Sequence, residues 1–273
     1  MSLNLKWYDI DRLDNRNSDA VAWVANTLGP LLRRYFRAEV RGSERVPPGG
    51  ALYVGNHNSG SLTPDSFIFL EALYRAHGIS AMPHGLGHEF AISLPVLHQI
   101  VVPLGAVRAS HDNGEKLLQR GEKVLVYPGG DEDALRPYRR RNEVVFGGRQ
   151  GYIRLALRTG VPIIPVVAAG AHATFYVIDD LRWLAKLIGA NRWGRFKVWP
   201  LTLSIPWGLT LGPLLPHIPW PTKILIEILE PFHFERTGPE AAADEAWVSE
   251  CSRRVESTMQ STLYRLAAEI EKR

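Results

Sequence analysis

The stretch Ala51-Leu52-Tyr53-Val54-Gly55-Asn56-His57 decides the fold class. Its first five residues follow Pro47-Pro48-Gly49-Gly50, and a short apolar run after such a turn is typical of a buried strand. A polar loop comes next, and Pro64 then suits the first turn of a helix. The apolar residues expected on that helix are Phe67, Ile68, Leu70, Leu73 and Tyr74. Strand, polar loop and helix in this order form the repeating unit of a parallel sheet.

The same alternation continues along the chain. Further strands are predicted at 100–103, 123–127, 161–168 and 224–229, and further helices at 112–120 and 150–159. We therefore expect an α/β fold in a single domain, with one mostly parallel sheet flanked by helices. Its parts would be an N-terminal amphipathic helical segment (1–40), an α/β core (41–235) and a long C-terminal helix packed on the core (236–273). Within the first part, the helix at 19–38 should kink at Gly29-Pro30.

Composition narrows the class of protein. The 273 residues are 45% apolar and 22% charged, which excludes a disordered or collagen-like chain. One cysteine, Cys251, excludes an intramolecular disulfide and a zinc site built from several cysteines. The net charge of +4 is mild, and no nucleic-acid partner is expected. The N-terminus has no apolar signal region, so we expect a cytoplasmic protein.

Two segments suggest contact with a membrane. Residues 198–222 contain no Asp, Glu, Lys or Arg but six prolines and three tryptophans, so we expect a buried or membrane-contacting loop system rather than a spanning helix. The predicted N-terminal helix ends in Arg33, Arg34 and Arg37. These arginines either complement the helix dipole or face anionic headgroups, and the sequence leaves both open.

Polar loops after three predicted strands hold the candidate chemistry, because function gathers at the carboxyl ends of parallel strands. His57 leaves one strand, and Asp65 in the next helix either orients the imidazole or only caps that helix. Gly129 and Gly130 form either an oxyanion-binding turn or a plain turn. The basic run 136–141 and Arg149 either hold an anion or face solvent.

Other motifs are missing or weak. The sequence has no G-x-S-x-G elbow and no glycine-rich nucleotide loop. His84 and His88 have the spacing of a helical zinc pair, but Gly85 and Gly87 argue against a helix there, and no metal is expected. Ser59 lies close enough to His57 in sequence to be considered as a nucleophile.

Taken in order, these pieces resemble the glycerolipid acyltransferase superfamily, the lysophosphatidic acid acyltransferase-like proteins. Asn56-His57 followed by Pro64-Asp65 resembles the Asn-His…Asp signature, and Gly105-Ala106-Val107-Arg108 resembles a second motif that ends in arginine. Pro128-Gly129-Gly130, followed by Arg136-Pro137, is similar to the third block in its monoacylglycerol and diacylglycerol acyltransferase-like branch. The resemblance covers residues 40–170 and extends to 223–232.

The resemblance implies an acyl-CoA-dependent O-acyltransferase. It moves a fatty acyl chain from acyl-CoA or acyl carrier protein to a glycerolipid hydroxyl, most simply that of 1-acylglycerol-3-phosphate or another lysophospholipid. His57 would be the general base and Asp65 its orienting partner. Substrate contacts would come from Asn56, Arg108, Gly129, Gly130, Arg136 and Arg149. No metal or redox cofactor is implied, and attachment would be peripheral, at the inner face of the membrane.

Three alternatives stay open at this point. In the first, the acceptor is a mono- or diacylglycerol or a glycolipid, which keeps the same chemistry. A thioesterase or lipid hydrolase would use His57 with Ser59 and would release fatty acid without an acceptor. A non-catalytic lipid-binding protein would bind without turnover.

Overall fold

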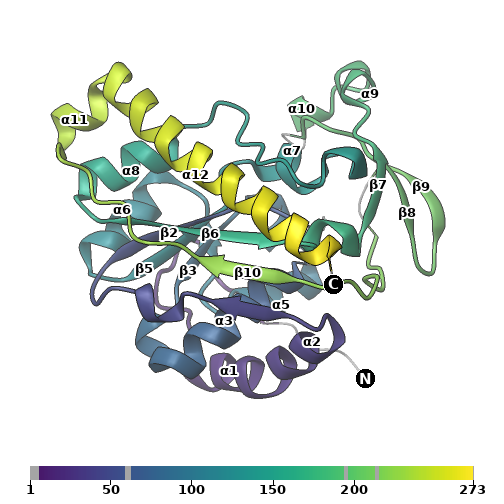
Figure 1. Ribbon diagram of the computed structural model, residues 1–273, viewed down its shortest axis with the longest axis horizontal. Helices are drawn as coiled ribbons and strands as arrows, with labels where there is room; N and C mark the ends of the chain where they lie inside the picture. The colour runs from purple at the N-terminus through teal and green to yellow at the C-terminus, as the bar shows by residue number, and fades with distance from the viewer. Residues whose placement is uncertain (1–5, 59–62, 194–195, 213–214, 273) are drawn as a thin grey trace.

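A seven-stranded sheet forms the centre of the computed structural model, which describes residues 6–58, 63–193, 196–212 and 215–272. The strand order is β1-β10-β6-β2-β5-β3-β4 (Figure 1). The strands are β1 (Glu39–Arg41), β2 (Ala51–Gly55), β3 (His84–Gly87), β4 (Val107–Arg108), β5 (Lys123–Val126), β6 (Ile163–Ala169) and β10 (Leu225–Ile228). Strands β6, β2, β5, β3 and β4 pair in parallel, whereas β10 is antiparallel to β6. The mostly parallel sheet predicted from the sequence is confirmed.

Helices cover both faces of this sheet (Figure 1). One face carries α6 (His111–Gln119), α8 (Gly151–Thr159), α11 (Pro239–Ala243) and α12 (Glu245–Glu271). The other carries α1 (Ser18–Trp23), α2 (Gly29–Tyr35) and α3 (Pro64–His77). Strand β2 contributes to the hydrophobic cores on both faces of the sheet. Leu52 and Val54 point to the first face, and Ala51 and Tyr53 point to the second. Burial on both faces explains why its sequence is a continuous apolar run.

One predicted strand is wrong. Residues 100–103 belong to the end of α5 (Pro95–Val101) and the turn after it, and Pro95 stands in the first helical turn. A short apolar run does not by itself distinguish a strand from a helix end. The other short helices are α4 (Glu89–Ile92), α7 (Gly130–Ala134), α9 (Arg182–Leu187) and α10 (Ala190–Trp193), with 3₁₀ turns η2 (Ser43–Arg45), η3 (Gly78–Ala81), η4 (Tyr138–Arg140) and η5 (Ala171–Thr174).

The two terminal helices are less regular than predicted. A π-helical segment, η1 (Val24–Leu28), joins α1 to α2 and lies just before the Gly29-Pro30 pair where a kink was expected. The C-terminal helix begins only at Glu245, because the Asp244 side chain caps it by accepting a hydrogen bond from the Trp247 amide at 3.0 Å.

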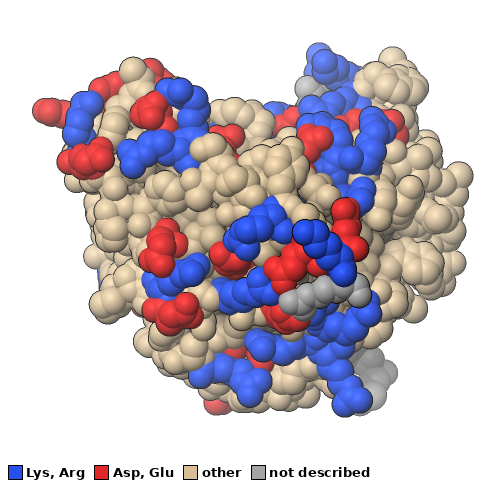
Figure 2. Space-filling view, in the orientation of Figure 1, with Lys and Arg blue, Asp and Glu red and all other residues tan. Residues whose placement is uncertain are grey.

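A second, antiparallel sheet stands at one side of the molecule and was not predicted (Figure 1). It consists of β7 (Tyr176–Asp179), β8 (Leu201–Ser204) and β9 (Gly208–Leu211). The expectation of a loop system over 198–222 is therefore wrong for its first half. Pro200 precedes β8 and Pro206 lies in the hairpin turn, so neither interrupts a ladder. On the face shown by Figure 2, the surface at this edge of the molecule is almost free of charged side chains.

No helix in the described parts of the chain is long and apolar enough to cross a membrane.

Candidate active site

Asn56 fastens the loop after β2 to the neighbouring strand β6. Its side chain is buried, donates from Nδ2 to the Ala168 carbonyl at 3.0 Å and accepts from the Ala168 amide at 2.9 Å. The amide group thus extends the strand pairing by one side chain. Asn56 was predicted to contact substrate; in this geometry its side chain holds the loop against β6.

The main chain of His57 is clamped from the next strand connection. Its amide donates to Oδ2 of Asp133 at 2.6 Å, and its carbonyl accepts from Nη1 of Arg136 at 2.7 Å. Both partners belong to α7 or the turn after it, which follows β5, and β5 is the parallel neighbour of β2. The carboxyl ends of the two strands are therefore joined through His57.

The His57 ring is poised to act as a neutral base. It is half-buried and packs on the Tyr127 ring, with centroids 4.8 Å apart. Nδ1 lies 3.3 Å from the Asn58 carbonyl oxygen, so Nδ1 carries the proton and Nε2 keeps its lone pair. Desolvation, aided by the Arg136 charge, lowers the pKa of His57 to about 4. The ring is therefore uncharged at neutral pH.

Asp65 was predicted to orient the His57 ring, but it reaches the His57 loop through one intervening residue. In the described part of the chain no hydrogen bond joins it to His57; instead its Oδ2 accepts from Nδ2 of Asn58 at 2.9 Å. Its other oxygen, Oδ1, is buried without a partner there. Desolvation raises the pKa of Asp65 to about 6. Asp65 thus reaches the histidine loop through Asn58, and the alternative nucleophile Ser59 lies outside the described residues.

Replacement of this carboxylate should reveal its cost to stability. A buried acid whose pKa is raised from 3.8 to about 6 loses stabilisation as the pH rises through that interval. Asp65→Asn should therefore raise the free energy of unfolding by about 1–3 kcal/mol at pH 8, and by about 1 kcal/mol less at pH 5. Urea unfolding at the two pH values measures the difference. A gain independent of pH, or a loss at pH 8, would contradict the assignment of a buried carboxylate with a raised pKa.

Arg136 is a buried scaffold. It is fully buried and forms an ion pair with Asp133 at 2.9 Å. Its remaining donors are taken by carbonyl or amide oxygens of His57, Asn58, Asp133, Arg140 and Arg141. All five N–H groups are used, so the substrate-binding role predicted for Arg136 has no free donor to carry it.

The Gly129-Gly130 turn lies on the other side of Asp133. A Cβ at Gly129 would come within 2.2 Å of the Asp133 Cβ and 2.3 Å of the Val145 carbonyl oxygen, so no larger residue fits. Gly130 has φ of +53° and its amide donates to the Tyr127 carbonyl. No partner of the Gly129 amide is found among the described residues, which leaves it as the candidate oxyanion donor.

Arg149 supports this turn, whereas Arg108 is remote from it. Arg149 donates from Nη1 to the Pro128 and Gly129 carbonyls and pairs through Nη2 with the side chains of Asp131 and Glu132. Arg108 pairs with Asp11 at 2.5 Å, and its strand β4 is three positions from β2, about 14 Å at the usual strand spacing. The three predicted arginines therefore do not converge on one pocket.

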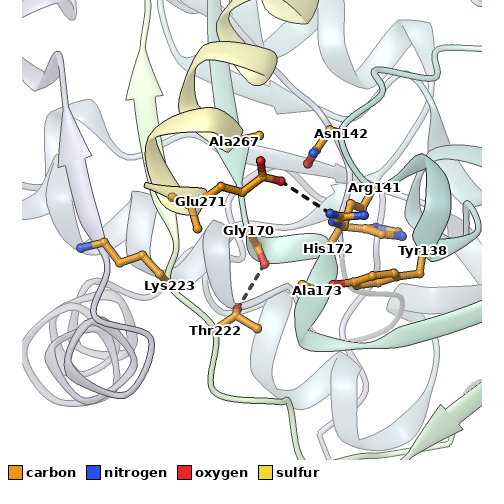
Figure 3. A pocket seen from close by; sticks show the side chains of 11 residues that line it. Tyr138, Arg141, Asn142, Gly170, His172, Ala173, Thr222, Lys223, Ala267 and Glu271 are labelled. Atoms are coloured by element: carbon orange, nitrogen blue, oxygen red, sulfur yellow. Dashed lines mark hydrogen bonds and ion pairs between the residues drawn. The ribbon is translucent and has the colours of Figure 1, made fainter. Parts of the chain in front are cut away.

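Two cavities border the site. An apolar one of about 190 Å³ lies beside Pro128, lined in part by Leu86, Val126 and Leu155. The other, of about 230 Å³, lies at His172 (Figure 3). Nε2 of His172 donates to the Arg136 carbonyl at 2.8 Å. The two cations lining the second cavity already pair with carboxylates, Arg141 with Glu271 and Lys223 with Glu39.

Sequence reasoning missed Asn58 and Asp133, the residues at the centre of this network. Asn58 joins Asp65 to Arg136, and Asp133 joins His57 to Arg136 and to the Val145 amide. The only signal for Asp133 was its place three residues before Arg136, the spacing of an ion pair on one helical turn. Within the described residues no cluster of three His, Cys, Asp or Glu side chains could hold a metal, and His84 lies in strand β3.

Comparison with known proteins shows similarity to acyltransferases. A family model described as Acyltransferase matches residues 37–169. An uncharacterized protein of Mycobacterium tuberculosis is 31% identical over 245 residues, 88% of this chain and 65% of the relative, so the chain spans less than two thirds of that protein's length.

Two mammalian proteins and one solved structure are also similar. The human diacylglycerol O-acyltransferase 2-like protein 6 is 26% identical, over 63% of this chain and 54% of its own length. A mouse enzyme named as synthesizing storage lipids independently of DGAT1/2 is 25% identical over 54% of this chain and 44% of its own length. The fold matches the crystal structure of the 1-acyl-sn-glycerophosphate acyltransferase PlsC from Thermotoga maritima, with a TM-score of 0.54 and 20% identity over 92% of this chain and 83% of that one.

Proposed function

Since this chain belongs to the glycerolipid acyltransferase superfamily, we propose that it transfers a fatty acyl chain from a thioester to a glycerolipid hydroxyl. The donor would be acyl-CoA or acyl carrier protein. The observation that carries the proposal is the neutral His57 ring, held by its main chain at the carboxyl end of β2 with Nε2 unprotonated.

The reaction is a direct displacement. Nε2 of His57 takes the proton of the acceptor hydroxyl while the hydroxyl oxygen attacks the thioester carbonyl carbon. The oxyanion that forms accepts a hydrogen bond from the Gly129 amide. The carbon–sulfur bond then breaks, the proton passes from His57 to the departing thiolate, and the ester remains on the acceptor. No acyl-enzyme forms, and the apolar cavity beside Pro128 is suited to part of the acyl chain.

The acceptor is the finer part of the proposal. The resemblance implied a lysophospholipid and predicted that Arg108, Arg136 and Arg149 contact substrate. The donors of Arg136 are all occupied and Arg108 is bound to Asp11, which favours a neutral mono- or diacylglycerol instead. We therefore rank the neutral acylglycerol first and the lysophospholipid second.

An acceptor panel tests this ranking. Purified protein is given oleoyl-CoA with monooleoylglycerol, dioleoylglycerol or lysophosphatidate, and the lipid products are identified by mass spectrometry. We expect ester formation to be fastest with a neutral acylglycerol. Preferred formation of phosphatidate would restore the lysophospholipid, whereas release of free oleate without any ester would favour a hydrolase.

These acceptors are membrane lipids, so we also propose that the protein attaches peripherally to the cytoplasmic face of a membrane.

A further inference from the structure

The small sheet β7-β8-β9 has an inverted pattern of polarity. Along β8, Thr202 and Ser204 point inward and are buried, whereas Leu203 points outward and is 41% exposed. Leu209 and Leu211 of β9, paired with Leu203 and Leu201, are 64% and 53% exposed. An antiparallel sheet on a water-exposed surface normally shows the opposite alternation, polar outward and apolar inward. This outer face is therefore built for an apolar environment.

The face belongs to a larger apolar surface. Of the twenty-three exposed large apolar side chains among the described residues, thirteen lie between Tyr176 and Trp220. They are Tyr176, Ile178, Trp183, Leu187, Ile188, Leu203, Ile205, Trp207, Leu209, Leu211, Leu215, Ile218 and Trp220, and we call them the apolar lobe. Soluble monomers rarely expose so many large apolar side chains in one part of the chain without a partner.

Unpaired cations flank the apolar lobe on two sides. Lys186 and Arg192, on α9 and α10, are exposed, and no ion pair of either is found in the described structure. Across the lobe, the Tyr35 hydroxyl at the end of α2 donates to the Pro219 carbonyl at 2.8 Å, which brings Arg34 and Arg37 beside it. These two arginines are likewise exposed and without an acidic partner among the described residues. Figure 2 shows basic side chains above and below the uncharged edge of the molecule.

The lobe is also attached to the candidate active site. Phe175, Val177 and Val198 pack on Ala134 and Leu135, at the end of α7. Glu132 of α7 pairs with Arg182 at 3.0 Å and with Lys197 at 2.8 Å. The surface that faces outward on the lobe is thus fixed to the helix that clamps His57.

We infer that the apolar lobe is the membrane-docking surface of this protein, with an anionic lipid bilayer as its partner. Tryptophans at 183, 207 and 220 suit the headgroup boundary, the leucines of β8 and β9 enter the acyl region, and the flanking cations meet anionic headgroups. Complementarity of charge favours a bilayer over a second copy, whose lobe would carry the same four cations. The inference rests on the proposed function for its lipid acceptor, but its test needs no catalysis.

Vesicle co-sedimentation of L209E/L211E tests the inference. Wild-type protein should pellet with vesicles of phosphatidylcholine mixed with phosphatidylglycerol, and the double variant should bind about 100-fold more weakly, because two leucines lose their burial. The charge-matched control I79E/Y264E changes two exposed apolar residues outside the lobe and should bind like wild type. Replacement of Lys186 and Arg192 by Gln should weaken binding to the mixed vesicles by about thirtyfold and leave binding to pure phosphatidylcholine unchanged.

Two results would overturn the inference. One is vesicle binding that L209E/L211E and the control reduce equally, or that neither reduces. The other is a wild-type dimer in sedimentation velocity that L209E/L211E converts to a monomer, with no change in vesicle binding. Failure of the acceptor panel with intact vesicle binding would refute the proposed chemistry alone.

Discussion

His57→Ala should lower kcat by about 10²–10⁴-fold, the usual loss when a general base is removed. The protein should nevertheless stay folded, because Asp133 and Arg136 hold the main chain of His57 and alanine keeps both contacts. Initial rates of thiol release and the urea midpoint, measured on one preparation, separate the two effects.

Another histidine provides the control for this variant. His77 is exposed at the end of α3 and its ring hydrogen-bonds the Ser43 carbonyl, so His77→Ala should retain wild-type activity. Ser59→Ala should also retain substantial activity, since the displacement needs no serine nucleophile. An unchanged kcat in His57→Ala, or a loss of activity in Ser59→Ala, would show that another residue performs the step assigned to His57.

Arg136→Met should be the most destabilising single change near the site. Among the described residues it removes the one cation that forms an ion pair with Asp133, which is fully buried and would be left as an uncompensated charge. Breaking a buried ion pair in this way costs about 3–5 kcal/mol. We expect that loss in the free energy of unfolding, measured with urea at neutral pH.

A double variant distinguishes the ion pair from a general packing defect. Asp133→Asn in the Arg136→Met background removes the unpaired charge and should recover part of the lost stability. Recovery should be partial because Arg136→Met also leaves several carbonyl oxygens without their hydrogen-bond donor. A loss below about 1 kcal/mol for Arg136→Met, or no recovery in the double variant, would argue against the scaffold described for Arg136.

The central strands and their helices could be predicted because each carries a strong local signal. Strand β2 is a continuous apolar run bounded by turns, and α8 ends at Gly160, which adopts the left-handed conformation expected of a helix stop. Strands β3 and β4 had no such signal, since β3 contains two glycines and β4 has two residues. Their place in the sheet comes from pairing with β5 and with each other.

The site was predicted in outline but not in its connections. His57 and the Gly129 turn follow from their places after strands, which sequence order reveals. The burial of Arg136 could not be foreseen, because its partners are main-chain oxygens of distant or irregular segments, including those of His57 and Arg141. A basic run in a sequence is usually solvated, and only the fold shows that its first member points inward. Asn58 was missed because its side-chain partners, Asp65 and Arg136, meet it only in the fold.

The ratio of ester formed to thiol released distinguishes acyl transfer by this protein from hydrolysis. Wild-type protein and His57→Ala are compared with oleoyl-CoA, with and without the preferred acylglycerol. We expect equal amounts of ester and free CoA in the wild type, little thiol without acceptor, and loss of both products in His57→Ala. Thiol release at the same rate without acceptor, with free oleate as the product, would contradict it.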